Sequence, residues 1–283
     1  MTIHPDGPPD ELRAFARQSF GTDQTWITLS GGRSNRSWRL KTGAGSWVFK
    51  LFDADRSNRL FPNDPTAERA ALQVLAGTGL APDFQTSFAT GTGICIVYRY
   101  VAGAPLRYTD AETIRTLARL HQVGAPKLRR LESTPRALLQ QGRQIVAGLR
   151  GEGVKELDRC APEPRDIPAG PSVFLHGDPV PANVLAYGEK RMLIDWQCPA
   201  IGDATADLAI ALSPAMHVVY GAGALPPADE FTALQAYPDA SVIERYLSLK
   251  PFFHWRMAAY CAWKVAQGEA VYARAFEAEL SRI

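Results

Sequence analysis

Two short segments in the second half of the chain carry side chains that suit phosphoryl transfer. Phe174–Leu185 (FLHGDPVPANVL) and Met192–Trp196 (MLIDW) bring Asp178, Asn183 and Asp195 close together in sequence. Phosphoryl transfer requires an aligned acceptor oxygen and neutralised phosphate charge. Asp178 could accept the proton of an acceptor hydroxyl, while Asn183 and Asp195 offer the oxygen ligands that magnesium prefers. The spacing therefore favours ATP-dependent phosphoryl transfer.

A simpler explanation exists for part of this pattern. The tripeptide that ends at Asp178 is weak evidence by itself, because Gly-Asp is common in turns and Asp often caps them. A plain turn does not account for the later Asn183 or for the hydrophobic strand that ends at Asp195. His176 lies beside a strand, and we interpret it as an orienting hydrogen-bonding residue rather than a base or metal ligand.

These segments resemble those of the aminoglycoside phosphotransferase and choline kinase family, which has a protein-kinase-like fold. The family pattern is His-Gly-Asp, four residues, Asn, and then a hydrophobic strand that ends Ile-Asp-Trp, and the chain contains every element. The resemblance implies that Asp178 is the catalytic aspartate and that Asn183 and Asp195 bind magnesium. Gly202–Leu208 (GDATADL) is similar to a further family segment, which implies that Asp207 anchors the catalytic loop through backbone hydrogen bonds.

The resemblance also implies that the N-terminal part of the chain binds the nucleotide. Leu29–Leu40 (LSGGRSNRSWRL) predicts a turn followed by a strand, and Trp47–Phe52 (WVFKLF) predicts its hairpin partner. The glycines of the turn would let the backbone approach phosphate, and the polar residues after them could donate hydrogen bonds. The candidate phosphate-binding residues are Gly31, Gly32, Ser34 and Asn35. A Gly-Gly pair before a strand is also common in ordinary hairpin turns, and no Walker lysine follows it.

Lys50 lies within the second of these strands. A strand lysine is solvated by default, but the family places a phosphate-binding lysine here. Asp64–Leu75 (DPTAERAALQVL) predicts a helix with an Asp N-cap and a Pro at its first position. Its Glu68 could serve only as a first-turn carboxylate that stabilises the helix dipole. The order of the two residues favours an ion pair between Lys50 and Glu68.

A hinge between two lobes is expected where the buried-strand pattern Ile94–Val101 (ICIVYRYV) gives way to AGAP. The family resemblance implies that adenine lies against this backbone, with main-chain contacts from Arg99 and Val101. Thr109–Glu112 forms a capping box for a helix over Ile114–His121, whose family-like end we interpret as packing.

We expect an α+β fold of two lobes, like that of protein kinases. The small N-terminal lobe, residues 1–101, would contain an antiparallel sheet, and the larger, mainly helical C-terminal lobe, residues 102–283, would carry the catalytic loop and substrate site. A chain of 283 residues with 46% hydrophobic content can fill two such cores. Its four cysteines are scattered, and no apolar run reaches the roughly 18 residues that cross a bilayer. We therefore expect a reduced, cytoplasmic protein without a membrane partner.

The expected activity is that of a small-molecule kinase, which uses ATP and magnesium to phosphorylate a hydroxyl group. The formal charge of +2 argues against a nucleic-acid partner, and nothing implies a protein partner. A nucleotide-binding protein without turnover is an alternative. A protein kinase is disfavoured because Trp-Gln rather than Phe-Gly follows Asp195. A metal-dependent hydrolase lacks a second cluster of ligands.

The acceptor is the least constrained part of this prediction. Few acidic runs follow the metal strand, only Asp229 and Glu230 being adjacent, so we expect a small amino alcohol such as choline or ethanolamine rather than a polycationic aminoglycoside. An aromatic such as Trp196, Trp255 or Trp263 could hold its cationic head. The aromatic segment around the last two is apolar nearly all round, which equally predicts a buried core helix. An aminoglycoside or another alcohol is the alternative acceptor.

Overall fold

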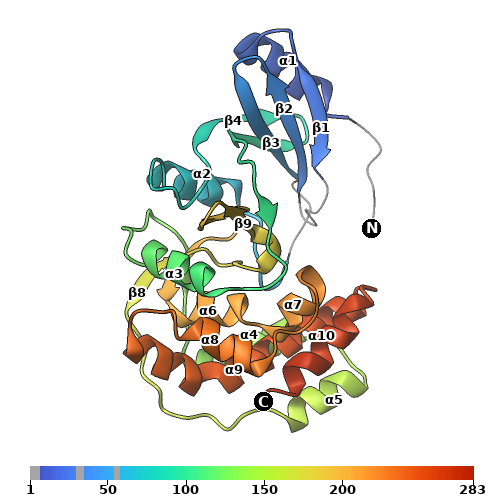
Figure 1. Cartoon of the computed structure of the whole chain (residues 1–283). Coiled ribbons are helices and arrows are strands. Elements are labelled where there is room, and N and C mark those ends of the chain that lie inside the picture. Colours follow the sequence, from blue (N-terminus) through green and yellow to red (C-terminus); the bar gives the residue numbers. More distant parts are fainter. Residues whose placement is uncertain (1–6, 30–34, 54–57) are drawn as a thin grey trace.

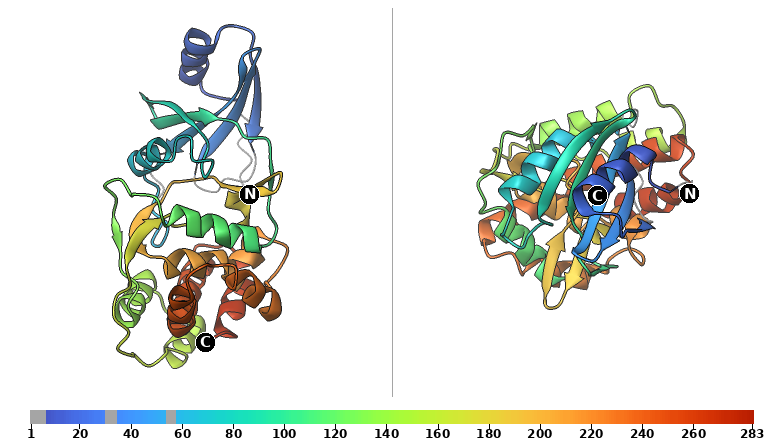
Figure 2. Two further views of the ribbon diagram at one scale, coloured as in Figure 1. Left: turned by 60° about the vertical axis from the view of Figure 1, so that its left-hand side comes forward. Right: turned by 90° about the horizontal axis from the view of Figure 1, so that it is seen from above.

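The structure is a computed structural model that describes residues 7–29, 35–53 and 58–283. The chain forms two stacked lobes, a sheet-based N-terminal lobe and a mainly helical C-terminal lobe (Figure 1, Figure 2). The expected α+β architecture of two lobes is therefore confirmed. Within these residue ranges, no helix combines the length and apolar character that crossing a bilayer requires.

Five strands and two helices form the N-terminal lobe. They are α1 (Asp10–Phe20), β1 (Thr25–Leu29), β2 (Arg36–Thr42), β3 (Gly45–Asp53), α2 (Pro65–Val74), β4 (Phe84–Thr90) and β5 (Gly93–Arg99). The sheet is antiparallel in the order β1-β2-β3-β5-β4. Side chains alternate between the two faces of a strand. In the central β3, Phe49 therefore packs with α1 on one face, while Lys50 points from the other face toward α2 and the second lobe.

The start of α2 agrees with its sequence. The Asp64 side chain accepts hydrogen bonds from the backbone N–H groups of Thr66 and Ala67, at 2.8 and 3.0 Å, which confirms it as the N-cap. β5 ends at Arg99 and the next strand begins at Ala104. The exact boundary between the lobes at residue 101 stays a prediction.

Helices make up most of the C-terminal lobe. They are α3 (Ala111–Leu120), α4 (Pro135–Ile145), α5 (Glu152–Arg159), α6 (Thr205–Ala211), α7 (Pro214–Tyr220), α8 (Pro227–Leu234), α9 (Ala240–Ala266) and α10 (Val271–Leu280). The long α9 runs through the lower lobe beside α4, α6 and α10 (Figure 1). Its segment from Phe252 to Cys261 is buried all round, so the prediction of a core helix is confirmed.

Two small sheets lie at the top of this lobe and carry its polar loops. One has the order β10-β9-β6 and the other the order β7-β11-β8. Their strands are β6 (Ala104–Pro105), β7 (Arg130–Leu131), β8 (Ser172–Leu175), β9 (Val184–Tyr187), β10 (Lys190–Leu193) and β11 (Ala200–Asp203), with a short 3-10 helix η1 (Pro181–Asn183) before β9. The turn after β10 faces the N-terminal lobe, since Asp195 pairs with Lys50 and Gln197 accepts a hydrogen bond from Asn35.

Candidate active site

The loop that follows β8 is fixed from below by a buried carboxylate. Asp207, in the first turn of α6, is 0% exposed. Its Oδ2 accepts a hydrogen bond from the backbone N–H of His176 at 2.8 Å, and its Oδ1 accepts one from Gly177 at 2.9 Å. The predicted role of Asp207 as a backbone anchor is confirmed. His121 Nε2 lies 3.2 Å from the same carboxylate. His121 therefore forms a hydrogen bond with Asp207 in addition to the packing role that the sequence predicted.

His176 orients the loop and does not act as a metal ligand in this arrangement. Its Nδ1 accepts the backbone N–H of Asp178 at 3.2 Å, so its Nε2 must carry the proton that it donates to the Ile194 carbonyl oxygen at 3.0 Å. The ring is fully buried against Trp196. Burial lowers the pKa of His176, which keeps the ring in this neutral form. The interpretation of His176 as an orienting residue is confirmed.

Asp178 and Asn183 contact each other across the catalytic loop. Asn183 Nδ2 donates to the backbone oxygen of Asp178 at 3.0 Å and to its Oδ2 at 3.3 Å. Burial, together with the nearby Asp195 carboxylate, raises the pKa of Asp178 to about 8, although the hydrogen bond from Asn183 acts in the opposite direction. A carboxylate with a raised pKa is a stronger proton acceptor, as general-base chemistry requires.

Asn183 and Asp195 stand on neighbouring stretches of backbone. The Ile194 N–H donates to the Asn183 carbonyl oxygen at 2.9 Å, which extends the pairing of β9 with β10 by one residue. Asp195 then adopts φ 63°, and it is the only non-glycine residue with a positive φ in the described chain. A non-glycine residue in this conformation costs on the order of 1 kcal/mol or more. The turn directs the Asp195 carboxylate out of the strand and toward the N-terminal lobe.

Lys50 joins three elements by ion pairs. Its Nζ lies 2.5 Å from Glu68 Oε2 on α2 and 2.5 Å from Asp195 Oδ1 in the C-terminal lobe. Lys50 is 3% exposed and Glu68 is 1% exposed. Burial alone would lower the pKa of Lys50, but the two carboxylates outweigh it and raise the pKa, so the lysine stays charged. The structure thus brings together the pair that the sequence suggested and adds Asp195 to it.

The oxygen atoms at this site fit magnesium. Lys50 occupies only Oδ1 of Asp195, and Asn183 uses its amide nitrogen toward Asp178, so that Oδ2 of Asp195 and Oδ1 of Asn183 have no hydrogen-bond partner among the described residues. Magnesium is usually bound in kinases by one or two such protein oxygens together with substrate phosphates. The described residues contain no cluster of three His, Cys, Asp or Glu side chains that could hold a metal.

Four residues were predicted to bind phosphate, and three of them, Gly31, Gly32 and Ser34, lie outside the described residues. Asn35 is described, and its amide joins the two lobes. Its Nδ2 lies 2.9 Å from Asn63 Oδ1 and 3.0 Å from Gln197 Oε1. A phosphate-binding role for the Asn35 side chain would require these bonds to break. The sequence did not indicate the roles of Asn63 and Gln197, because the spacing of residues along the chain does not show which distant polar side chains will be in contact.

The hinge offers fewer free backbone groups than expected. The Arg99 N–H donates to the Asp83 carbonyl oxygen at 2.8 Å, so only its carbonyl group could meet a ligand. Val101 makes no backbone hydrogen bond to another described residue, and its main-chain groups are placed between β5 and β6. The adenine-binding role of both residues stays a prediction.

The expected aromatic box for a cationic acceptor is not formed. Trp196 and Trp255 are buried, and their Nε1 atoms donate to the carbonyl oxygens of Leu193 and Leu157 at 2.9 and 2.8 Å. The ring of Trp263 is already approached by cations of the chain itself, from Arg59 at 5.7 Å and Lys264 at 5.4 Å. The expected ring contact was wrong for Trp255, which lies in the buried helix α9, and for Trp196, which is buried in the core after β10.

The adjacent acidic pair has a structural position as well. Asp229 and Glu230 lie in the first turn of α8. Glu230 is buried and forms ion pairs with Lys250 and Arg282. Glu230 is therefore neutralised within the C-terminal lobe, whereas Asp229 is exposed on α8.

Comparison with known proteins assigns the family. Residues 25–243 match the model of the phosphotransferase enzyme family, so the chain belongs to that family. It is a small-molecule kinase, of the class that transfers phosphate to hydroxyl groups. Streptomycin 3''-kinase of Streptomyces griseus is 27% identical over 280 residues, which cover 87% of this chain and 92% of the relative.

Two solved structures show the same fold. A choline/ethanolamine kinase family protein from Mesorhizobium loti superposes with a TM-score of 0.64 at 19% identity, covering 96% of this chain and 92% of that one. Choline kinase from Cryptosporidium parvum Iowa II gives a TM-score of 0.65 at 14% identity, covering 96% and 94%. At these identities the likeness concerns the fold alone.

Proposed function

We propose that the protein transfers the γ-phosphoryl group of ATP, with magnesium, to a hydroxyl group of a small molecule. The observation that carries this proposal is the proximity of Asp178, Asn183 and Asp195 to one another and to the buried Lys50. Little covalent chemistry is required of the protein in such a reaction, so alignment and charge neutralisation are its main tasks.

Each residue has one task in this proposal. Asp178 orients the acceptor hydroxyl and accepts its proton, and the hydrogen bond from Asn183 holds that carboxylate in place. Lys50 neutralises phosphate charge while Glu68 fixes its position. Magnesium, when bound by Asn183 and Asp195 together with nucleotide phosphates, would supply the remaining charge neutralisation.

An aminoglycoside is the acceptor we favour over a small amino alcohol. The streptomycin kinase matches 92% of its own length to this chain, which supports an acceptor of that chemical class. The amino-alcohol prediction depended on the scarcity of acidic runs and on aromatic rings, and the structure buries those rings. Similarity in fold to choline and ethanolamine kinases keeps choline and ethanolamine as the second candidates.

An ADP-release assay over a panel of alcohols tests the proposal. The panel contains streptomycin, spectinomycin, kanamycin, choline, ethanolamine, homoserine, thiamine and simple sugars, with and without magnesium, and phosphorus NMR identifies the product. We expect magnesium-dependent phosphorylation of an aminoglycoside. Turnover of choline or ethanolamine alone would overturn the acceptor but retain the kinase.

The variant Asp178→Asn separates chemistry from nucleotide binding. It should lower kcat by roughly 10²–10⁴-fold, the usual contribution of a general base, and leave the Kd for ATP nearly unchanged. Asp229→Asn removes an exposed carboxylate on α8 and is the matched control. Unchanged turnover in Asp178→Asn would contradict the catalytic assignment.

A further inference from the structure

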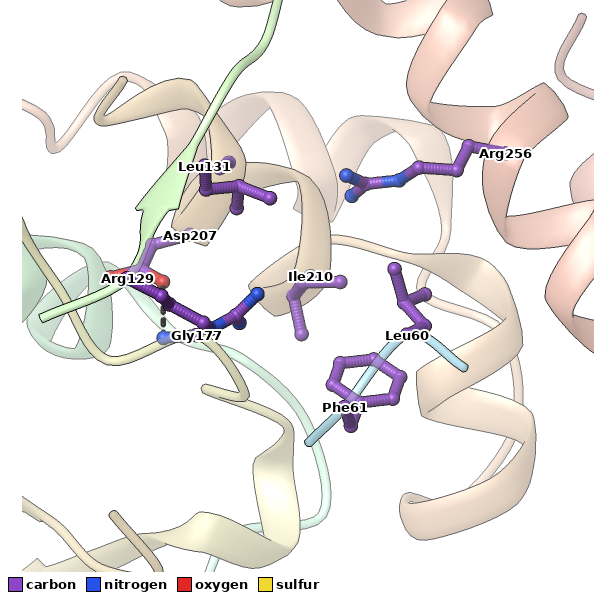
Figure 3. Close-up of a pocket in the computed structure, with 9 residues that line it drawn as sticks. Leu60, Phe61, Arg129, Leu131, Gly177, Asp207, Ile210 and Arg256 are labelled. Carbon is purple, nitrogen blue, oxygen red and sulfur yellow. Dashed lines mark hydrogen bonds between the residues drawn. The ribbon is translucent and has the colours of Figure 1, made fainter. Parts of the chain in front are cut away.

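A small cavity behind the catalytic loop is faced by two arginines. It offers about 20 Å³ to the centre of a water-sized group, which is room for one water or one small ion. Figure 3 shows Arg129, which precedes β7, and Arg256, on α9, with their guanidinium groups turned toward the same space. The rest of the wall includes Leu60, Phe61, Leu131, Gly177, Asp207 and Ile210.

Arg256 is a buried cation without a carboxylate partner. It is 2% exposed, and no ion pair joins it to any residue in the described part of the chain. Its Nη1 donates to the neutral Gln141 Oε1 at 2.9 Å, while its buried Nε has no hydrogen-bond partner there. An unpaired buried charge destabilises the folded protein. A negatively charged group beside Arg256 would therefore stabilise the folded protein.

Arg129 increases the positive charge at the same place. Its Nη2 donates to the Cys198 carbonyl oxygen at 3.1 Å, and it too lacks an ion pair among the described residues. Part of its side chain is exposed, which links the cavity with solvent. Burial lowers the pKa of Arg256 to about 10, and the positive charge of Arg129 acts in the same direction, whereas the Glu279 carboxylate opposes the shift.

The cavity wall contains one negatively charged residue in addition to the two positively charged arginines. Asp207 lines the cavity, but its oxygens are already bonded to the backbone of the catalytic loop and to His121. The three charged groups that line the cavity therefore leave a net charge of about +1; the Glu279 carboxylate, whose charge also reaches Arg256, lies outside this wall and is already bonded to Ser213 and His254. A water molecule could satisfy the free N–H of Arg256, whereas only an anion would also neutralise the charge.

We propose that a monovalent inorganic anion of the size of chloride binds between Arg129 and Arg256. The cavity is too small for a nucleotide or a sugar, and its net charge matches one negative charge. Through Arg129 and Cys198 the anion would brace the segment that follows Asp195, and through the cavity wall it would contact Gly177 of the catalytic loop. The site is separate from the cleft in which phosphoryl transfer is proposed.

Thermal unfolding of the whole protein in matched salts gives the first test. At equal ionic strength, sodium chloride or bromide should raise Tm by roughly 2–3 °C relative to sodium gluconate, whose anion is too large, as expected for a ligand near ten times its Kd. Equal Tm values in chloride, bromide and gluconate would overturn the proposal.

The variant Arg256→Gln tests the site itself. It keeps a polar side chain but removes the charge, and the difference between chloride and gluconate should disappear. Arg115→Gln is the matched control, since Arg115 lies on the exposed face of α3 paired with Glu112, and this variant should retain the difference. A retained difference in Arg256→Gln would place the anion elsewhere and overturn the assignment.

Crystals of the unmodified protein soaked in sodium bromide decide the matter even when Arg256→Gln fails to fold. An anomalous peak between the two guanidinium groups would support the proposal. Its absence, with water in the cavity, would refute it.

Discussion

Replacement of Asp207 by asparagine should disable the catalytic loop without touching the reacting groups. The carboxylate accepts backbone N–H groups of His176 and Gly177 at 2.8 and 2.9 Å from a fully buried position. Asparagine has the same size but only one acceptor oxygen. Its amide nitrogen must therefore face one of these donors or His121, and at least one buried donor loses its partner.

The size of the effect follows from these bonds. A hydrogen bond to a charged group contributes about 1.5–3 kcal/mol against about 1 kcal/mol for a neutral one, and an orphaned buried donor costs about 1–3 kcal/mol. Together these changes predict that Asp207→Asn lowers the free energy of unfolding by about 3–5 kcal/mol. Because Asp178 follows directly on the anchored residues, kcat should fall more than ATP affinity.

Hydrogen exchange and urea denaturation measure this prediction at two levels. The backbone amides of His176 and Gly177 should exchange much faster in Asp207→Asn, by a larger factor than the amides of β3, whose exchange reports only the general loss of stability. Asp229→Asn, at an exposed site, serves as the control for loss of one charge. Unchanged exchange at the two amides, with a stability loss below about 1 kcal/mol, would refute the reasoning.

Three further predictions concern the cleft. Asp195→Ala should abolish magnesium-dependent nucleotide binding and Asn183→Ala should only weaken it, because a carboxylate brings a full charge and an amide a dipole; magnesium titrations that rank them in reverse would exchange their roles. Removing Lys50 and Glu68 together should cost less than the sum of the single losses in kcat/KM, with a coupling of about 1–3 kcal/mol, and additive losses would argue against a functional pair. Gly177→Ala, at φ +84° with no space for a Cβ, should destabilise the protein by about 1–3 kcal/mol, as a thermal melt would detect.

The features that could be predicted from sequence are the local ones. The N-cap at Asp64 and the order of Asp178, Asn183 and Asp195 depend on neighbouring residues, and their placement follows from short elements whose patterns are clear. The helix around Trp255 has apolar residues on nearly all sides, which predicted a buried core helix. Its tryptophans nevertheless also suggested a binding site for a cationic group. Whether a ring lines a cleft depends on which helices surround it, and a single helix pattern does not contain that information.

Features that depend on two lobes meeting could not be predicted. The ion pair of Lys50 with Asp195 and the hydrogen bond from Asn35 to Gln197 join residues more than a hundred positions apart. The charge balance around Arg256 is of the same kind, because no stretch of sequence shows that a helix arginine will be buried without a carboxylate. Such features require the packed structure.

The lobe interface and the proposed metal site are built from the same short segment. Lys50 reaches Asp195, Asn35 reaches Gln197, and the backbone N–H of Asp64 donates to the Gln197 carbonyl oxygen at 2.9 Å. All three contacts cross between lobes within two residues of the strained Asp195. Any movement of one lobe against the other must therefore shift the carboxylate that we propose as a magnesium ligand. Closure of the lobes on a nucleotide and completion of the metal site would then be one event.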